Sequence, residues 1–177
     1  MYRCYMVLFL CSLIIKESAA AQRFIAGYRF SRLSKQEIVY LSDYLTQIES
    51  VSHKLLSEEQ VKYLVREFDS GSLRPLDPHQ TLTTRKRFQR QRLLVASDWS
   101  YYTQQRIPLA LRETGEGGWD LHHIIFIRLN GQNEWWNIIP LLRGEHHKVI
   151  HGREQPGELL HRHLAARLPR CNNPELD

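Results

Sequence analysis

Hydrophobic residues recur at helical spacing in two segments of the first half of the chain. The first segment follows Ser34 and extends to about Val51, and the second follows Ser57 and ends at Ser70-Gly71. Their apolar positions are Ile38, Leu41, Leu45 and Ile48 in the first, and Val61, Leu64, Val65 and Phe68 in the second. Each serine is followed three residues later by a glutamate or a glutamine, which is the capping-box signature of a helix start. The pattern predicts two amphipathic helices that bury their apolar faces.

Residues 71–80 interrupt this pattern with one glycine, two prolines and several polar side chains. Such a composition is typical of a linker, so we place the internal boundary of the chain here. A further helix is predicted after it, over residues 84–96. The predicted organisation is an N-terminal hydrophobic segment at 1–21, a helical region with its linker at 22–78, a second domain at 79–168 and a tail at 169–177.

From residue 119 to residue 125 the pattern changes to alternation of apolar and polar positions. Alternation places neighbouring side chains on opposite faces of a strand. A turn signal follows at Asn130-Gly131, residues 137–141 indicate a second strand, and a short helix is expected within residues 141–152. Helices followed by strand, loop, strand and helix predict an α+β fold.

The two ends of the chain carry separate signals. Residues 1–21 have the layout of a secretory signal, with Arg3 before an apolar run of 11 residues and small residues suited to cleavage after it. The run is too short to span a bilayer, so no stable membrane anchor is expected. The alternative is a remnant of a longer toxin or of an upstream region. Near the other end a short helix is predicted over 158–168, and His161 and His163, which cannot share a helical face, are expected at the surface.

Charge changes this picture in one part of the chain. The 177 residues carry a net charge of +5, whereas residues 85–112 alone hold seven basic residues and one acidic residue, which gives +6. This stretch is either a surface that follows the phosphates of a nucleic acid or a solvated helix face without function. Its position directly before a histidine-rich segment favours the first interpretation. The candidate contact residues are Arg85, Lys86, Arg87, Arg90 and Arg92.

Residues 119–152 contain five of the nine histidines and three of the four tryptophans. His147 and His151 are four residues apart, so on a helix both imidazoles project from one face and can share a cation. His146 is the rival of His147, but it is five residues from His151, which breaks the shared face. We therefore prefer His147.

His122 and His123 are neighbours on the first predicted strand, so their side chains point to opposite faces and cannot both bind the same metal ion. If His122 turns toward the helix, it becomes a third nitrogen ligand and His123 stays off the metal. Three protein ligands with an open position characterise a catalytic metal site, whereas structural zinc sites are closed by four ligands, usually including cysteine. The segment contains no cysteine.

The segment has the sequence pattern Trp-x-x-His-His-Ile-Ile, then Gly-x-Asn-Glu-Trp-Trp-Asn-x-x-Pro-Leu, then His-x-x-x-His-Gly. It resembles the HNH motif of the ββα-metal nuclease superfamily. It is most similar to the HNH nuclease domains of bacterial polymorphic toxins, with colicin-type DNases as more distant relatives. The resemblance covers residues 106–159 and departs from the pattern in the loop, where Phe126 replaces a proline and Asn130-Gly131 replaces two glycines.

The resemblance implies a metal-dependent endonuclease, a hydrolase that cleaves phosphodiester bonds in DNA, with RNA as an alternative substrate. His122, His147 and His151 would hold one divalent ion, for which Mg²⁺ is favoured and Zn²⁺, Ni²⁺ and Mn²⁺ are alternatives. His123 would take the proton from water, a task that suits an imidazole because its pKa lies near the working pH. Asn137 would orient this histidine through hydrogen bonds to the loop that carries it.

The same resemblance implies a bacterial toxin or effector that acts in a target cell after export. Such a protein requires a dedicated immunity protein, which would be acidic if it covers the basic surface. Two alternatives stay open at this point: a non-catalytic nucleic-acid-binding module with a structural metal, and a secreted nutrient nuclease. The absence of a His-Glu-x-x-His pattern argues against a zinc protease.

Overall fold

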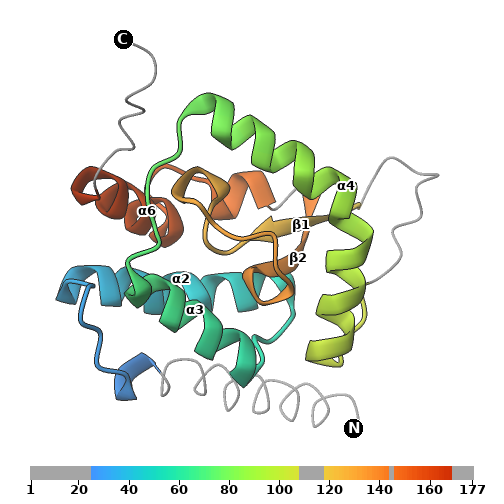
Figure 1. Ribbon diagram of the computed structural model, residues 1–177. Coiled ribbons are helices and arrows are strands. Elements are labelled where there is room, and N and C mark those ends of the chain that lie inside the picture. Colours follow the sequence, from blue (N-terminus) through green and yellow to red (C-terminus); the bar gives the residue numbers. More distant parts are fainter. Residues whose placement is uncertain (1–24, 108–117, 144–145, 169–177) are drawn as a thin grey trace, which may run out of the picture.

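The structure, a computed structural model, describes residues 25–107, 118–143 and 146–168, without the side chains of residues 146 and 147. In this part of the chain helices surround a two-stranded antiparallel sheet, which makes the fold α+β (Figure 1). The main elements are α2 (Lys35–Ser52), α3 (Glu58–Ser70), α4 (Pro78–Thr103), β1 (Trp119–His123), β2 (Ile138–Leu142), a short π-helix (His146–Ile150) and α6 (Pro156–Arg167).

Both helices predicted in the first half of the chain are confirmed. Ser34 accepts a hydrogen bond from the Glu37 amide, and the Glu37 carboxylate accepts one from the Ser34 amide. Ser57 and Gln60 form the same reciprocal pair at the start of α3. Helix α3 ends at Gly71, whose φ of +79° lies in the left-handed region that glycine adopts without strain. The predicted stripes are buried at Leu41, Leu45, Ile48, Val61, Leu64, Val65 and Phe68.

The prediction for the third helix was wrong in its bounds, because α4 begins at Pro78 and not near residue 84. The Asp77 side chain accepts a hydrogen bond from the Gln80 amide, and the Gln80 side chain accepts one from the Asp77 amide. Pro78 occupies the first helical position, where no amide donor is needed. The aspartate and the proline that suggested a linker are therefore a helix start, and the connection shortens to residues 71–77.

Strands β1 and β2 pair antiparallel, with His123 opposite Ile138. The alternation predicted as far as Ile125 is wrong beyond His123, because the chain bends there and buries both Ile124 and Ile125 completely. The bend is held by the side chain of Asn137, which bonds to the amide and the carbonyl of Ile125 in place of a partner strand. The first strand is therefore five residues long.

The helix expected within residues 141–152 follows strand β2, which continues to Leu142. Arg143 is helical, residues 144 and 145 lie outside the described residues, and His146–Ile150 has π-helical hydrogen bonding. His151 lies just beyond its end. The four-residue spacing of the two histidines therefore does not correspond to one turn of an α-helix, which corrects the geometric basis on which they were paired.

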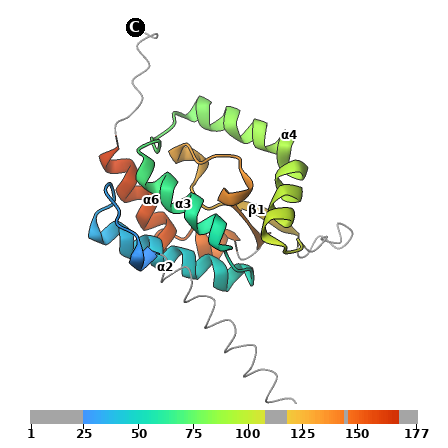
Figure 2. The ribbon, with the colours of Figure 1, turned by 60° about the horizontal axis from the view of Figure 1, so that its bottom comes forward.

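One hydrophobic core joins the two ends of the described chain. Helices α2 and α6 pack side by side, with α2 below the sheet in Figure 1, and α4 curves around the other side of the sheet (Figures 1 and 2). Arg167 of α6 bonds to the Glu37 carboxylate at 2.7 Å, which closes the α2–α6 contact. The core includes Leu41, Tyr44, Leu45, Leu64, Ile124, Ile125, Leu141, Ile150, Leu160 and Leu164.

The predicted signal segment at 1–21 and the tail at 169–177 lie outside the described residues. Within the described ranges, no helix is both long and apolar enough to cross a membrane.

Candidate functional site

A cleft of about 600 Å³ opens where the first part of α4, the end of β1 and the start of α6 meet. Its polar lining includes Arg85, His122, His123, Arg128, His151 and Glu158. Four of these residues were selected from the sequence as site candidates. The fold therefore brings together candidates that lie up to 66 positions apart along the chain, as the numbers 85 and 151 show.

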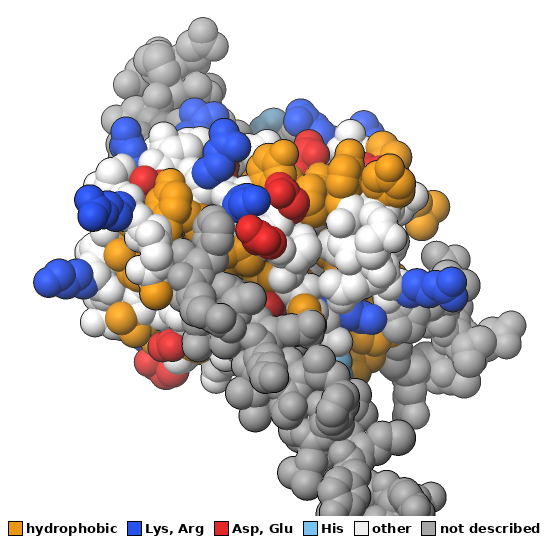
Figure 3. All heavy atoms as spheres, turned by 90° about the horizontal axis from the view of Figure 1, so that it is seen from below, with side chains coloured by type: hydrophobic (Ala, Val, Ile, Leu, Met, Phe, Trp, Pro, Cys, Tyr) orange, Lys and Arg blue, Asp and Glu red, His pale blue; other side chains and the backbone are white. Residues whose placement is uncertain are grey.

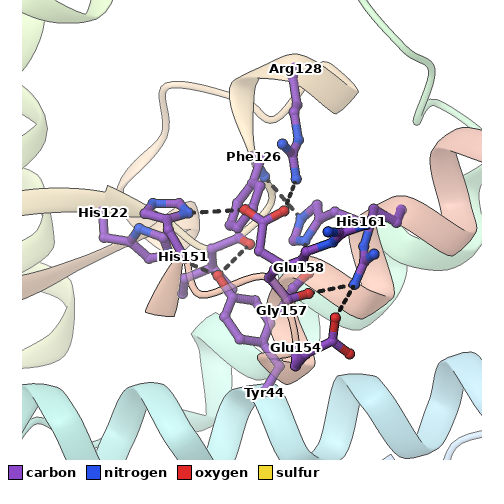
Figure 4. Close-up of polar contacts among 12 residues, drawn as sticks. Tyr44, His122, Phe126, Arg128, His151, Glu154, Gly157, Glu158 and His161 are labelled. Atoms are coloured by element: carbon purple, nitrogen blue, oxygen red, sulfur yellow. Dashed lines mark hydrogen bonds and ion pairs between the residues drawn. The ribbon is translucent and has the colours of Figure 1, made fainter. Parts of the chain in front are cut away.

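His122 and His151 are the two predicted metal ligands whose side chains the structure describes. Their ring centroids are 5.2 Å apart, and both residues line the cleft (Figure 4). The side chain of the third predicted ligand, His147, lies outside the described residues. Among the side chains that are described, no group of three histidines, cysteines or carboxylates is arranged to hold a metal ion.

Glu158 bridges the cleft between His151 and Arg128. Its Oε1 lies 3.2 Å from the His151 Nδ1, and its Oε2 lies 2.5 Å from the Arg128 guanidinium (Figure 4). The carboxylate is largely buried, with 13% of its side chain exposed. A buried charge needs such a partner, so Arg128 makes the position of the carboxylate stable and the carboxylate in turn orients the imidazole.

Tyr44 of α2 contacts the imidazole of His122 through its hydroxyl. Its hydroxyl lies 2.7 Å from the His122 Nε2 and donates to the Ile124 carbonyl at 3.0 Å (Figure 4). Burial raises the pKa of Tyr44 well above its ordinary value, and the negative charge of Glu158 acts in the same direction. The phenol is therefore neutral at physiological pH.

His123 points to the other face of β1, as the strand alternation predicts. Its Nε2 lies 2.9 Å from the Asn133 Oδ1, and its ring packs edge-on against Phe88 of α4. The Asn133 amide nitrogen donates to the Thr84 carbonyl at 3.4 Å, so the amide oxygen is the atom that faces the imidazole. His123 therefore donates through Nε2, and Nδ1 carries the lone pair.

Burial lowers the pKa of His123 to about 4. The hydrogen bond to Asn133 opposes this shift, and the positive charge of Arg85 adds to it. The imidazole is consequently neutral at pH 7, which is the state that a proton acceptor requires.

Asn137 is fully buried next to the bend that follows His123. Its Oδ1 accepts from the Ile125 amide at 2.7 Å, and its Nδ2 donates to the carbonyls of Ile125 at 3.1 Å and Gln132 at 2.9 Å. The side chain thus fixes both the bend after β1 and the loop that carries Asn133. It contacts backbone rather than the cleft lining, and the orienting role that the resemblance implies stays a prediction.

The five basic candidates of α4 divide into three groups. Arg85 lines the cleft, and Lys86, Arg87 and Arg90 are exposed along the helix. Arg92 instead donates to the Trp119 carbonyl at 3.0 Å and lies 3.9 Å from the Asp120 carboxylate. Arg92 therefore anchors α4 to β1, a structural contact that its place in the charged run did not reveal.

The face of the molecule seen from below has a different character. Its lysine and arginine side chains are scattered, with acidic side chains between them (Figure 3). On the described part of this face no continuous basic patch is visible. The α4 side of the cleft is therefore the better candidate for contact with phosphates.

The expectation that His161 lies at the surface was wrong. Its side chain is completely buried, and its ring stacks on Phe126 with centroids 3.6 Å apart. The ring donates through Nδ1 to the Gly157 carbonyl at 2.5 Å and accepts from the Phe126 amide at 3.1 Å. These bonds satisfy both nitrogens, so burial is tolerated although it lowers the pKa of His161 to about 3. His163 is exposed, as expected.

Four polar residues of the site were not selected from the sequence, namely Tyr44, Arg128, Asn133 and Glu158. Tyr44 stands on the apolar stripe of a helix, where a core residue is the usual interpretation. Glu158 lies beyond the glycine that ends the histidine motif. Asn133 lies inside the motif, two residues after the turn, and a polar side chain at that place was the one available signal.

Comparison with known proteins finds similarity to a protein that is named a toxin, although no protein-family model matches the chain. This protein is Toxin YxiD from Bacillus subtilis (strain 168), and the identity is 26% over 133 residues. The match covers 68% of this chain and 23% of that protein, so the similar region spans about a quarter of the relative's length.

Proposed function

We propose that the chain is a metal-dependent HNH endonuclease that hydrolyses phosphodiester bonds in DNA and serves as a bacterial toxin or effector. The observation that carries the proposal is the cleft in which neutral His123 lies beside the His122–His151 pair. A proton acceptor next to a pair of imidazole ligands, open to a basic helix, is the constellation that phosphodiester hydrolysis needs. RNA is the alternative substrate with the same backbone chemistry.

Two described imidazoles, those of His122 and His151, would contribute ligands to a divalent cation. His151 is oriented by a carboxylate on Nδ1 and His122 by a hydroxyl on Nε2, which is how proteins commonly brace metal-binding imidazoles. His147 would be the third ligand. Nitrogen donors suit Zn²⁺ and Ni²⁺, whereas Mg²⁺ and Mn²⁺ prefer oxygen and would take more of their ligands from water and phosphate.

When bound, the cation would neutralise charge on the scissile phosphate and stabilise the leaving oxygen. His123 supplies the other requirement, because its Nδ1 can accept the proton of an attacking water. A pKa of about 4 makes the imidazole a weak base before substrate binds. A phosphate that enters the cleft brings negative charge, which favours the protonated imidazole and raises this pKa toward the working range.

Phosphate positioning is assigned to the α4 edge of the cleft. Arg85 is both exposed and part of the cleft lining, and Lys86, Arg87 and Arg90 continue from it along the helix. Contacts of this kind bind the backbone without reading the bases, so cleavage with little sequence preference is expected.

Similarity to a protein named a toxin supports the toxin or effector role. A nuclease of this kind requires a dedicated immunity protein in the cell that makes it. An acidic partner that covers the α4 basic residues would block substrate and associate rapidly at low salt. A small acidic protein encoded beside the gene is the expected partner, and its co-expression should restore growth to cells that this chain otherwise kills.

Plasmid cleavage tests the proposal. Purified full-length protein is incubated with supercoiled plasmid, and separately with RNA, in Mg²⁺, Mn²⁺, Ni²⁺ or Zn²⁺. We expect nicking and linearisation of the plasmid, no cleavage by His123→Ala, and unchanged cleavage by His163→Ala, which alters an exposed histidine of α6. Intact DNA and RNA under all four metals would refute the endonuclease. DNA binding without cleavage, equal in wild type and His123→Ala, would instead indicate a non-catalytic binding module.

A further inference from the structure

Helix α2 contacts His122, a residue of the cleft lining, through the side chain of Tyr44. Tyr44 is completely buried, and its hydroxyl touches two groups that lie about eighty residues further along the chain. These groups are the His122 Nε2, at 2.7 Å, and the Ile124 carbonyl oxygen, at 3.0 Å. The N-terminal helical region therefore contacts a predicted metal ligand directly.

The two contacts fix the direction of each hydrogen bond. A phenol has a single proton, and a carbonyl oxygen can only accept. The Tyr44 proton therefore serves the Ile124 carbonyl, and the phenolic oxygen accepts from His122. Both contacts are satisfied only when the proton of neutral His122 sits on Nε2, which leaves Nδ1 as the coordinating nitrogen.

The tyrosine ring is packed closely between neighbouring groups of the core. The ring meets Gly157 of α6, where an added Cβ would lie 2.5 Å from a ring carbon. It also meets the rings of Phe126 and His161, with centroids 6.2 Å and 5.8 Å away. A glycine at position 157 is thus required by the close approach of the ring, and the packing of the ring places the hydroxyl beside His122.

We propose that Tyr44 is a positioning residue that sets the tautomer of His122 and thereby selects Nδ1 for metal coordination. This inference rests on the proposed function, because it assigns His122 to the metal. It gives the helical region of residues 22–78 a defined part in the site, because Tyr44 of α2 orients the predicted metal ligand His122 of β1. Orientation of this kind typically contributes about 10-fold to 100-fold in metal affinity.

The tautomer is measured directly in the wild-type protein. Full-length protein labelled with ¹⁵N at histidine is studied by long-range ¹H–¹⁵N correlation at pH 8 without metal, and the His122 signals are assigned by their absence in His122→Asn. Neutral imidazoles give different ¹⁵N shifts for the protonated and the unprotonated nitrogen. We expect the proton on Nε2; a predominant Nδ1–H form would overturn the proposal without any variant of Tyr44.

Tyr44→Phe then tests the cause. The substitution removes the hydroxyl and keeps the ring that packs against Gly157, Phe126 and His161. We expect a mixture of His122 tautomers and Ni²⁺ affinity about 10-fold lower by calorimetry. Tyr40→Phe is the matched control, because it removes a hydroxyl one helical turn earlier, where the structure places the ring beside exposed His163; both readouts should stay at wild-type values.

The outcomes separate this inference from the proposed function. An unchanged tautomer and an unchanged Ni²⁺ affinity in folded Tyr44→Phe would refute the positioning role even if the enzyme cuts DNA. A wild-type protein that cuts no nucleic acid would refute the endonuclease, while the tautomer of His122 and its response to Tyr44→Phe would still decide the role of the tyrosine. If circular dichroism shows that Tyr44→Phe does not fold, the wild-type measurement decides alone.

Discussion

The side chain of Asn137 clamps the backbone of Ile125 from both sides, accepting from its amide at 2.7 Å and donating to its carbonyl at 3.1 Å. The clamped residue lies two positions after His123. Pairing with a neighbouring strand would have kept the chain extended at Ile125. The side-chain amide of Asn137 takes the place of that strand and holds the chain in a bend. The orientation of the predicted proton acceptor therefore depends on one buried side chain.

Asn137→Ala should destabilise the fold and abolish cleavage together. The substitution leaves the buried polar groups of Ile125 without partners, at a cost of about 2 kcal/mol or more in the free energy of unfolding. Urea denaturation measures this cost and plasmid nicking measures activity. Gln132→Ala, an exposed position in the same loop, should change neither quantity. Wild-type stability in Asn137→Ala would show that the clamp is not needed.

Glu158→Gln should weaken metal binding with little effect on folding. The amide keeps the shape of the side chain but lacks the charge that orients His151 and pairs with Arg128. We expect Ni²⁺ affinity to fall about 10-fold by calorimetry. Glu154→Gln removes an exposed charge from the loop before α6 and serves as the control. Equal affinities in the two variants would contradict the orienting role of Glu158.

Exposed basic residues of α4 and the anchoring Arg92 should respond differently to neutralisation. Lys86→Gln, Arg87→Gln and Arg90→Gln should each weaken DNA binding and reduce the slope of log K against log salt by about one for each phosphate that is no longer neutralised. Arg92→Gln should instead reduce stability by about 1 kcal/mol, because the side chain can no longer bond to the Trp119 carbonyl. Binding isotherms at several salt concentrations and thermal unfolding separate the two effects. A uniform response in all variants would show that the run acts only through its total charge.

Stability should fall as the pH decreases from 6.5 toward 4. Burial lowers the pKa of His161 to about 3, whereas an unfolded histidine titrates near about 6.5. Well above this unfolded pKa both states are neutral, so the group adds no pH dependence. Below it the unfolded chain binds a proton that the folded chain excludes, and the free energy of unfolding drops by up to about 1.4 kcal/mol per pH unit.

Two variants assign this pH dependence to its source. His161→Phe keeps a ring against Phe126 and removes the titrating group, so denaturation midpoints should decline less steeply between pH 6.5 and 4. His163→Phe, at an exposed position of the same helix, should retain the wild-type slope. A wild-type slope in His161→Phe would mean that other groups cause the acid sensitivity.

The elements that could be predicted from the sequence are those whose signals are local. Capping boxes at Ser34 and Ser57 located the starts of two helices, because the cap and the apolar stripe lie in one short window. The third capping box, at Asp77, was missed because proline and aspartate also mark linkers. Local composition does not distinguish a turn from a helix start unless the glutamine three residues later is weighed as well.

The site was predictable where its residues belong to a local pattern, either the histidine motif or, for Arg85, the basic run. His122, His123 and His151 come from one histidine-rich segment, and the fold brings them to one cleft. Tyr44 and Glu158 join them through tertiary contacts that no spacing rule encodes. His161 was wrongly predicted to lie at the surface. A histidine on a helix is expected to be exposed, but here both ring nitrogens have hydrogen-bond partners inside the protein, which allows burial.

The residues that hold the cleft histidines in place come from distant parts of the chain, so the cleft can form only after all of these parts have been synthesised. Synthesis delivers Tyr44 first, His122 seventy-eight residues later and Glu158 last, and the chain leaves the ribosome in that order. Neither the carboxylate that orients His151 nor the glycine that seats the tyrosine ring exists until α6 has been made. A nascent chain therefore carries no complete cleft before α6 has been made, and the proposed chemistry has to wait for the last described helix.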